Sequence, residues 1–563
     1  MVYLHGKFID FRDMKKSLSK GLILVFLFNS LVVISLNTTG QEWIAPIQNT
    51  ILLSGNFAEL RATHFHSGID IRTGGVEGLP VVCVKDGVLA RVGVSPTGYG
   101  QVLYIEHADG TTTVYGHLQR FVPQIAEIVR KIQYDQESFR IDEDMRSYGL
   151  TFRQGDTIAY SGNTGSSGGP HLHFEIRDTR TEYTVNPLHY YRIRDTKSPV
   201  VRMIYLYSIS DEGVVEFLRQ CPVKQIQSGC YEGGQVSVPA GRIGIGVYAV
   251  DYMNDSWNKL GIYDMSLMAA GDTLFRMKTD TCSFGQSCFI NDVKDFDKYK
   301  KKETVYRCFG NYQEQFKAIT NKNKGNIIVS KDSVVKVKVW LADRNGNQTT
   351  VSLKLKGKQN NSEQVAGEEI LRYDRAHILQ VGDCLVKIDS GGLFFSTKKR
   401  LCVEKDTLSG RDIFVLSEKE VPLFKKAHLF IRGVYTPKAI ICEVNASGKK
   451  FPLETRLEAE GVSANIGYLN RYTVVEDREA PTITYLGKLP GQTLGFRIKD
   501  DLSGIAAYRG EVNGKWCLFS YDPRVNLLKC SLMEPVFEVG KTHEIKITVT
   551  DKAGNVREKK ISL

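Results

Sequence analysis

The chain carries three separated histidine motifs: Thr63-His64-Phe65-His66-Ser67-Gly68-Ile69-Asp70, Thr113-Val114-Tyr115-Gly116-His117 and Gly169-Pro170-His171-Leu172-His173-Phe174-Glu175. The 563 residues contain 11 histidines. More than half of them fall between the first and last of these motifs: His64, His66, His107, His117, His171 and His173. Because histidine is a common metal ligand and is seldom gathered in this way for packing alone, the clustering indicates a metal site.

The third motif predicts a β-strand. From His171 to Ile176 the chain alternates polar and apolar side chains, which is typical of a half-buried strand. Successive strand side chains point to opposite faces, so His171 and His173 should share one face, roughly 6.5–7 Å apart along the strand. Leu172 and Phe174 then face the core. At this spacing one imidazole can bind a metal while the other stands beside the group that the metal activates.

The first motif can supply the other ligands. Ser67-Gly68 allows a tight bend, because glycine adopts backbone angles that other residues avoid. Such a bend could bring His66 and Asp70 together with one later histidine. Two imidazoles, one carboxylate and an open position form the pattern of a catalytic zinc site, in which the pKa of bound water falls to about 7. A closed structural site would usually include cysteine, and only Cys83 lies close to the motifs.

These motifs resemble those of the lysostaphin-type (LytM-domain) zinc endopeptidases of bacterial cell walls. The resemblance covers about residues 45–190 and is supported by further runs of similar sequence: Gly98-Tyr99-Gly100, Ser161-Gly162-Asn163-Thr164-Gly165 and Gly169-Pro170. It implies a site of five residues, in which Zn²⁺ is held by His66, Asp70 and His173. It also implies that His117 and His171 flank the bound water and the scissile carbonyl, as general base and as stabilisers of the oxyanion.

Each motif by itself has a simpler interpretation. His171 and His173 could be a strand pair on a solvated face, His66 and Asp70 could form an ordinary polar turn, and His117 could be a buried histidine bonded to backbone. The agreement of three motifs in one order favours the metal site. His64 and His107 are interpreted as structural or substrate-facing rather than ligating, and Asn56 and Arg61 as lining the cleft or simply exposed.

Residues 1–40 are expected to be a signal peptide. Lys15, Lys16 and Lys20 precede an apolar run from Leu22 to Leu36, and small residues before Gln41 offer a cleavage site. An uncleaved membrane anchor is the alternative, although the run is short for a span. Either interpretation predicts an exported protein of the periplasm or cell envelope.

The rest of the sequence predicts a mainly β fold. Residues 41–194 are expected to form a LytM-type antiparallel β-sheet peptidase domain, with a helical insertion at about 122–144 where glycine is absent. A short internal repeat is present: Asp343-Arg344-Asn345-Gly346-Asn347 resembles Asp551-Lys552-Ala553-Gly554-Asn555. Each run ends a segment with strand-like runs. We therefore expect the following domains after the peptidase domain: an immunoglobulin-like β-sandwich at 195–357 with an insertion near 280–324, a β-rich domain of unknown type at 369–477 after a polar linker at 356–368, and a second immunoglobulin-like module at 478–563.

The 11 cysteines are an odd number, so at least one lacks an intrachain partner. The pairs that lie close in sequence are Cys221 with Cys230, Cys282 with Cys288, and Cys517 with Cys530. An exported protein permits disulfides, but spacing does not determine pairing. Cys83 lies in a strand-like run and is interpreted as a buried free thiol.

The predicted function is hydrolysis of peptide bonds in peptidoglycan by an exported zinc metalloendopeptidase. The alternative is a non-catalytic module that binds the cell wall or activates another murein hydrolase. A third interpretation makes the C-terminal β domains adhesion or scaffolding units, and these domains are candidate surfaces for envelope-protein partners. The net charge of +11 is modest for this length, and no basic patch with interleaved aromatic residues suggests nucleic acid.

Overall fold

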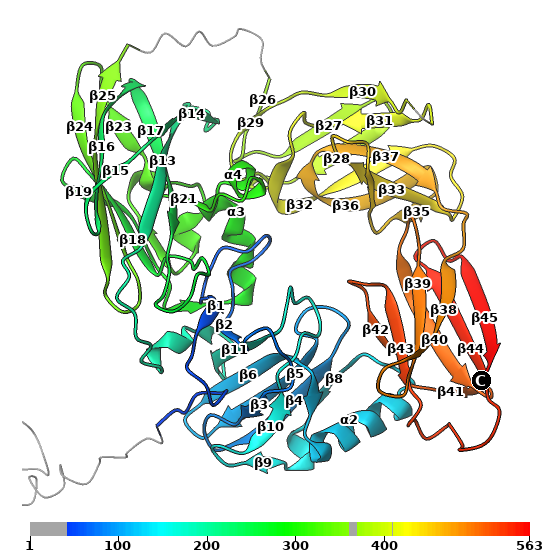
Figure 1. Ribbon diagram of the computed structural model, residues 1–563. Helices are drawn as coiled ribbons and strands as arrows, with labels where there is room; N and C mark the ends of the chain where they lie inside the picture. Colours follow the sequence, from blue (N-terminus) through cyan, green and yellow to red (C-terminus); the bar gives the residue numbers. More distant parts are fainter. Residues whose placement is uncertain (1–41, 360–368, 408) are drawn as a thin grey trace, which may run out of the picture. The chain divides into compact units, whose positions relative to one another are not determined.

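The computed structural model describes residues 42–359, 369–407 and 409–563. The expected signal peptide at 1–40 lies outside these residues. Strands dominate the described chain, so the prediction of a mainly β fold is confirmed (Figure 1). Within the described ranges, no helix is both long enough and apolar enough to cross a bilayer.

The first domain is built on an antiparallel sheet with the order β1-β2-β11-β6-β5-β4-β8. Its strands are β1 (Leu53–Gly55), β2 (Ile69–Arg72), β4 (Gly87–Val94), β5 (Gln101–His107), β6 (Thr111–Leu118), β8 (Ile141–Asp144) and β11 (His171–Asp178), with β9 (Thr151–Phe152) beside β4 and β12 (Thr184–Val185) beside β11. A second sheet contains β3 (Pro80–Val82), β10 (Thr157–Tyr160) and β7 (Arg120–Phe121). In β11, Leu172, Phe174 and Ile176 are fully buried, as the alternation predicts.

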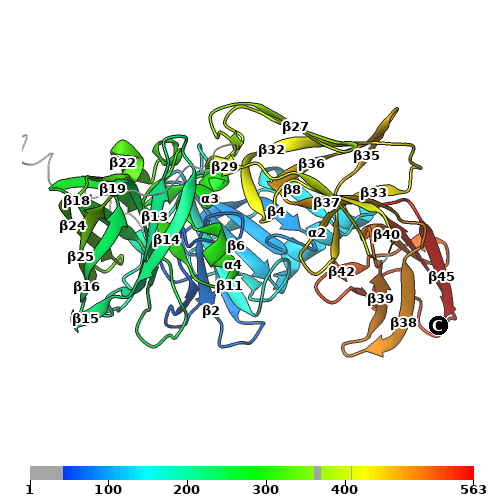
Figure 2. The same cartoon turned by 90° about the horizontal axis from the view of Figure 1, so that it is seen from above.

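The predicted helix at 122–144 is wrong at its C-terminal end. Helix α2 spans Pro123–Asp135, and Ile141–Asp144 is strand β8, paired antiparallel with β4. Strands β4 and β8 lie side by side in both views (Figures 1 and 2). Arg91 on β4 donates to both carboxylate oxygens of Asp142. The backbone N–H and C=O groups of β8 bond to the edge of β4 and not to their own segment, as they would in a helix. Local composition does not reveal that such an edge is available.

The strands from Val200 to Lys358, which we call the second domain, form two sheets. The first has the order β14 (Val215–Cys221), β13 (Val200–Ile209), β17 (Gly241–Val250) and β21 (Val305–Arg307), with β23 (Ile327–Val329) beside β17. The second has the order β15 (Lys224–Gln227), β16 (Cys230–Pro239), β25 (Gln348–Lys358), β24 (Val334–Ala342), β18 (Asp264–Ala269), β19 (Asp272–Lys278) and β22 (Ile319–Asn321). The expected insertion holds short elements: β20 (Thr281–Cys282), η4 (Phe284–Phe289), α3 (Ile290–Val293), α4 (Phe296–Lys300), η5 (Gln313–Gln315) and η6 (Asn323–Gly325).

The last two domains also each contain two packed sheets. In 369–477 the first sheet has the order β27 (His377–Val381), β28 (Cys384–Ile388), β32 (Val421–Arg432), β36 (Gly461–Leu469) and β35 (Arg456–Glu458). The second has the order β30 (Cys402–Lys405), β31 (Asp412–Val415), β37 (Arg471–Glu476), β33 (Ala439–Val444) and β34 (Lys450–Pro452). A separate pair is formed by β26 (Ile370–Leu371) and β29 (Thr397–Lys398). In 478–563 the first sheet has the order β38 (Thr482–Leu489), β39 (Thr493–Lys499), β43 (Leu527–Ser531) and β42 (Ser520–Asp522). The second has the order β41 (Lys515–Trp516), β40 (Ile505–Val512), β44 (Glu544–Asp551) and β45 (Val556–Ser562). Each domain has its own hydrophobic core, which is consistent with β-sandwich modules. The predicted linker at 356–368 starts too early, because β25 continues to Lys358.

The first domain shares backbone and side-chain hydrogen bonds with the second domain. β12 pairs with β20, and the Asn56 side chain both donates to Gly261 O (2.8 Å) and accepts from Gly261 N (2.7 Å). Lys294, which is fully buried, donates to the carbonyl of Arg61 at 2.7 Å. Burial lowers the pKa of Lys294 to about 8. These contacts fix the loop that precedes the first histidine motif.

All 11 cysteines are free thiols in the structure. Cys83 is fully buried, as predicted, and burial raises the pKa of its thiol to about 12. Cys517 and Cys530 are both buried, and their sulfur atoms lie 3.3 Å apart.

Candidate metal centre

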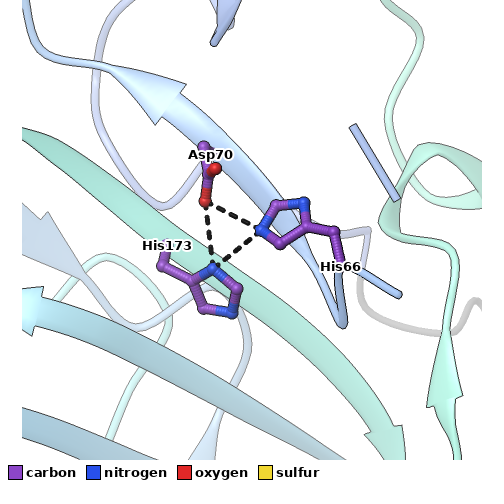
Figure 3. A group of neighbouring side chains, drawn as sticks. All are labelled: His66, Asp70 and His173. Carbon is purple, nitrogen blue, oxygen red and sulfur yellow. Dashed lines mark hydrogen bonds and ion pairs between the residues drawn. The ribbon is translucent and has the colours of Figure 1, made fainter. Parts of the chain in front are cut away.

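Three side chains meet at one point of the first domain. His66 Nε2 lies 3.0 Å from Asp70 Oδ1 and 3.1 Å from His173 Nδ1, and His173 Nδ1 lies 3.0 Å from Asp70 Oδ1 (Figure 3). Asp70 on β2 and His173 on β11 are direct partners in the antiparallel ladder. The sheet register therefore brings together two residues that are 103 positions apart in the chain.

His66 reaches this point through the bend that follows it. A side chain at Gly68 would place its Cβ 2.3 Å from the carbonyl oxygen of Phe174, so only glycine lets the first motif pass this close to β11. His66, Asp70 and His173 are all buried, with exposures of 5%, 7% and 4%. Residues of the first and third motifs thus form one buried cluster.

The cluster fits a zinc ion in donor chemistry and in spacing. Two ligand atoms at about 2.0–2.1 Å from a tetrahedral zinc lie about 3.3 Å apart, and the three atoms here are separated by only slightly less. Two imidazole nitrogens and one carboxylate oxygen are the ligand set of catalytic zinc sites that keep an open position.

Hydrogen bonds fix which imidazole nitrogens face this point. His66 Nδ1 lies 2.8 Å from the carbonyl oxygen of Asn56, and a carbonyl only accepts, so Nδ1 carries the proton and Nε2 is free. His173 Nε2 lies 2.8 Å from Glu175 Oε1, so His173 directs Nδ1 toward the cluster. Both free nitrogens point to the Asp70 oxygen, the arrangement that a metal requires.

The electrostatics of the cluster favour a cation. Burial raises the pKa of Asp70, but the neighbouring histidines, His66 first, outweigh burial and hold this pKa well below its usual range. Burial lowers the pKa of His173, yet Asp70 and Glu175 outweigh burial and raise it to about 9. Burial also lowers the pKa of His66, against the opposing effect of Asp70. Two carboxylates beside one imidazole thus stabilise a positive charge at this point.

Glu175 contacts one imidazole of the cluster, a position that sequence reasoning missed. Its side chain is fully buried and accepts hydrogen bonds from His173, Tyr99, Ser67 and Arg177. Burial raises the pKa of Glu175, but Arg177 and the bond from His173 outweigh burial and hold this pKa at about 2. Glu175 lies two residues after His173 on the same strand face, and this spacing was the available signal.

Arg61 and Asn56 form hydrogen bonds with Asp70 and His66, respectively. Arg61 donates to Asp70 Oδ2 at 2.7 Å, so Asp70 keeps Oδ1 for the cluster. The backbone carbonyl of Asn56 accepts from His66. The sequence placed both residues near the site without assigning these contacts.

His117 and His171 lie beside the cluster and face each other, with ring centroids 4.8 Å apart. His171 Nδ1 donates to the carbonyl of Gly169 at 2.8 Å, and its Nε2 lies 3.4 Å from Asp70 Oδ1. His117 Nδ1 donates to the carbonyl of Thr164 at 2.8 Å. Each ring is thus held at Nδ1 by a backbone carbonyl, and its Nε2 is the nitrogen available for proton transfer.

The backbone of His117 is unusual. Its φ of +58° lies in the left-handed region, which costs a non-glycine residue on the order of 1–3 kcal/mol and is concentrated at functional sites. The Thr164 carbonyl that holds the ring is fixed in turn: Gly165, with φ +73°, packs so closely on Gly100 that a Cβ would lie 2.3 Å from the Gly100 nitrogen. Burial, followed by the neighbouring histidines, lowers the pKa of His117 to about 3.

The other two histidines of the window are outside the cluster. His64 is exposed, and its Nδ1 lies 3.3 Å from the Thr63 hydroxyl. His107 is buried and bonds to the Asp86 carbonyl and the Thr113 hydroxyl. Neither residue belongs to the candidate metal group.

Comparison with known proteins identifies the same region. Residues 64–134 and 141–187 match the model of peptidase family M23. An uncharacterized metalloprotease of Haemophilus influenzae is 31% identical over 123 residues, which are 22% of this chain and 20% of that protein. The DD-carboxypeptidase/endopeptidase Mpg of Neisseria meningitidis is 32% identical over 118 residues, 21% of each chain.

Among solved structures, a zinc-containing peptidase from Vibrio cholerae is similar at 24% identity and a TM-score of 0.20, over 27% of this chain and 40% of that one. The chain spans about a fifth of the length of the two curated relatives.

Proposed function

We propose that the N-terminal domain, a member of the LytM-type peptidase family M23, makes this chain an exported zinc metalloendopeptidase that hydrolyses peptide bonds in peptidoglycan. The observation that carries the proposal is the cluster of His66, Asp70 and His173 with two further histidines beside it. Non-catalytic binding does not require either the converging nitrogens or the flanking pair.

His66, Asp70 and His173 would hold the zinc ion. When bound, zinc polarises a carbonyl oxygen and lowers the pKa of water so that hydroxide forms near neutral pH. Glu175 fixes the ring of His173 through its Nε2, and Arg61 occupies the second oxygen of Asp70. This support keeps the three donor atoms aimed at one point before substrate binds.

His117 and His171 would move the protons. Each ring is held at Nδ1 by a carbonyl and offers Nε2 as a base. The proton removed from the attacking water passes to one of these nitrogens and is then donated to the amine that leaves when the peptide bond breaks. Because burial and the neighbouring histidines keep the pKa of His117 low, its imidazole is neutral at the start of this cycle.

The substrate class follows from the relatives and not from the geometry alone. The Neisseria meningitidis relative is named a DD-carboxypeptidase/endopeptidase, which supports the stem peptides or cross-links of peptidoglycan as the substrate. The expected export signal and an envelope location fit that substrate. The C-terminal β domains are proposed to contact the wall or envelope proteins.

The test uses the full chain loaded with zinc. Defined cross-linked muropeptides are incubated with the wild type, with His171→Ala and with His64→Ala, and the products are weighed by mass spectrometry. We expect cleavage by the wild type and His64→Ala, and a loss of at least 100-fold in His171→Ala with its zinc retained. Absence of cleavage by the zinc-loaded wild type would favour the binding or activating role.

A further inference from the structure

The second domain contains a cluster of three aspartates that the peptidase site does not use. Asp195 precedes β13, Asp251 follows β17 and Asp343 follows β24. One carboxylate oxygen from each lies within 4.8 Å of the other two. Three chain segments thus bring three negative groups to one point.

Asp251 is the unusual member of this cluster. It is 4% exposed, and its Oδ1 has no hydrogen-bond partner anywhere in the described part of the chain. Burial, followed by the charges of Asp343 and Asp195, raises the pKa of Asp251 to about 8. A buried carboxylate oxygen without a donor is costly unless a cation or water satisfies it.

No side chain of the described residues supplies that cation. Among them, no lysine or arginine forms an ion pair with Asp195, Asp251 or Asp343. Lys197 donates to the carbonyl of Met253, and Arg344 donates to His189. These two side chains, which lie close in sequence to Asp195 and Asp343, therefore bond to other groups.

A small cavity adjoins the three carboxylates. Its volume is about 30 Å³, and Asp195, Asp251, Asp343 and Asn345 are among its lining residues. A cavity needs about 10–15 Å³ to hold a water molecule, so this one has room for an ion or for water that completes its coordination.

The last domain repeats the positions but not the unsatisfied oxygen. Asp477, Asp500 and Asp551 also lie within 4.8 Å of one another through one oxygen each. There, Asp500 Oδ2 accepts from the backbone nitrogens of Leu502 and Gly504, at 3.1 and 2.7 Å. Backbone donors thus satisfy Asp500, whereas Oδ1 of Asp251 has no donor among the described residues.

Both domains hold the cluster with the same turn. Asn347 N donates to Asp343 Oδ1 at 2.8 Å, and the Asn347 side chain donates to the carbonyl of Asp195 at 3.2 Å. In the last domain, Asn555 N donates to Asp551 Oδ1 at 2.8 Å. The turn orders the Asp343 loop and ties it to the segment that enters the domain.

We propose that Asp195, Asp251 and Asp343 bind a calcium ion. Calcium takes 6–8 oxygen ligands in irregular geometry, whereas zinc prefers nitrogen or sulfur and magnesium requires near-ideal octahedral coordination. The bound ion joins the segment that leaves the peptidase domain to the ends of β17 and β24. Calcium therefore stabilises the start of the second domain and is independent of the zinc site.

The experiment measures calcium bound per chain in protein freed of metal and reloaded with one equivalent of zinc. Equilibrium dialysis with radioactive calcium, up to about 10 mM, covers the affinity range of extracellular calcium modules. We compare the wild type with Asp251→Asn and Asp343→Asn, which keep side-chain size. Asp211→Asn is the control, because it removes one charge from the same domain at a side chain that is 99% exposed.

We expect Asp251→Asn and Asp343→Asn each to bind one calcium fewer per chain than the wild type and Asp211→Asn. Calcium should also raise the unfolding temperature of the wild type and of Asp211→Asn by several degrees more than that of the two site variants. Circular dichroism verifies that the variants fold. An equal number of bound ions in all four proteins, no binding by the wild type, or an equal loss in Asp211→Asn would each overturn the proposal.

Discussion

Glu175 Oε1 lies 2.8 Å from His173 Nε2, and the two residues are adjacent on the same face of β11. This contact decides which nitrogen of His173 faces His66 and Asp70. It links the buried hydrogen-bond network of Tyr99 and Arg177 to the proposed metal ligand. The properties of the metal centre should therefore depend on a residue that does not touch the metal.

Replacing Glu175 with Gln should weaken zinc binding by on the order of 10–100-fold, the usual effect of losing a partner behind a ligand histidine. The reason is that the amide holds the His173 proton less strongly and leaves Arg177 without its buried carboxylate. Competition with a fluorescent zinc chelator measures the affinity.

Glu182→Gln is the control for this prediction. Glu182 is the other carboxylate partner of Arg177, and its side chain is 57% exposed. It should bind zinc as the wild type does. Equal zinc affinity in the wild type and Glu175→Gln would show that the contact has no role in metal binding.

Replacing His117 with Asn should separate catalysis from metal binding. Asparagine tolerates the left-handed backbone better than most residues, so the variant should keep the local fold. We expect one zinc per chain and a fall in kcat of about 10²–10⁴ for cleavage of muropeptides. Zinc content and steady-state kinetics are the measurements. A variant with wild-type kcat would remove His117 from the proton-transfer pair.

Much of the site can be predicted from the sequence because its signals are local. Alternation identifies β11 and places His171 and His173 on one face, and Ser67-Gly68 indicates the bend. The register that sets His173 opposite Asp70 is a long-range property, and the sequence indicates it only through the family resemblance. Residues 141–144 could not be predicted as a strand, because they form one by pairing with the edge of β4 and not through their own composition. The hydrogen bond from His66 to the backbone carbonyl of Asn56 could not be predicted either, since every residue has a backbone carbonyl.

Asp292 should make the stability of the second domain depend on pH. It is fully buried with Oδ1 unsatisfied among the described residues, and burial raises its pKa to about 7 despite a hydrogen bond from Tyr312 N. Between about pH 4 and 7 the folded state thus holds a proton that the unfolded state has lost. The free energy of unfolding should fall by up to about 1.4 kcal/mol per pH unit as pH rises through this range.

Asp292→Asn removes this titration. Its unfolding temperature should depend less on pH between 4 and 7 than that of the wild type, as followed by circular dichroism. Asp297→Asn, in the neighbouring helix α4 and more exposed, should behave as the wild type. Parallel pH profiles for all three proteins would contradict the assignment.

Cys517 and Cys530 should form a disulfide under oxidising conditions, because their sulfur atoms are 3.3 Å apart. Peptide mapping of the oxidised and reduced protein identifies the bond. By the loop-closure argument it should stabilise the last domain by about 3 kcal/mol, and Cys517→Ser should lose this difference. Recovery of both residues as free thiols after oxidation would refute the prediction.

The central claim is that His66, Asp70 and His173 hold one zinc ion and leave it an open position. X-ray absorption at the zinc edge, on zinc-loaded full-length protein, tests this claim most directly together with zinc content. The account predicts one zinc per chain with two imidazole ligands, one carboxylate and one water, and loss of the ion in His173→Ala. A zinc with four protein ligands, or full zinc content in His173→Ala, would contradict it.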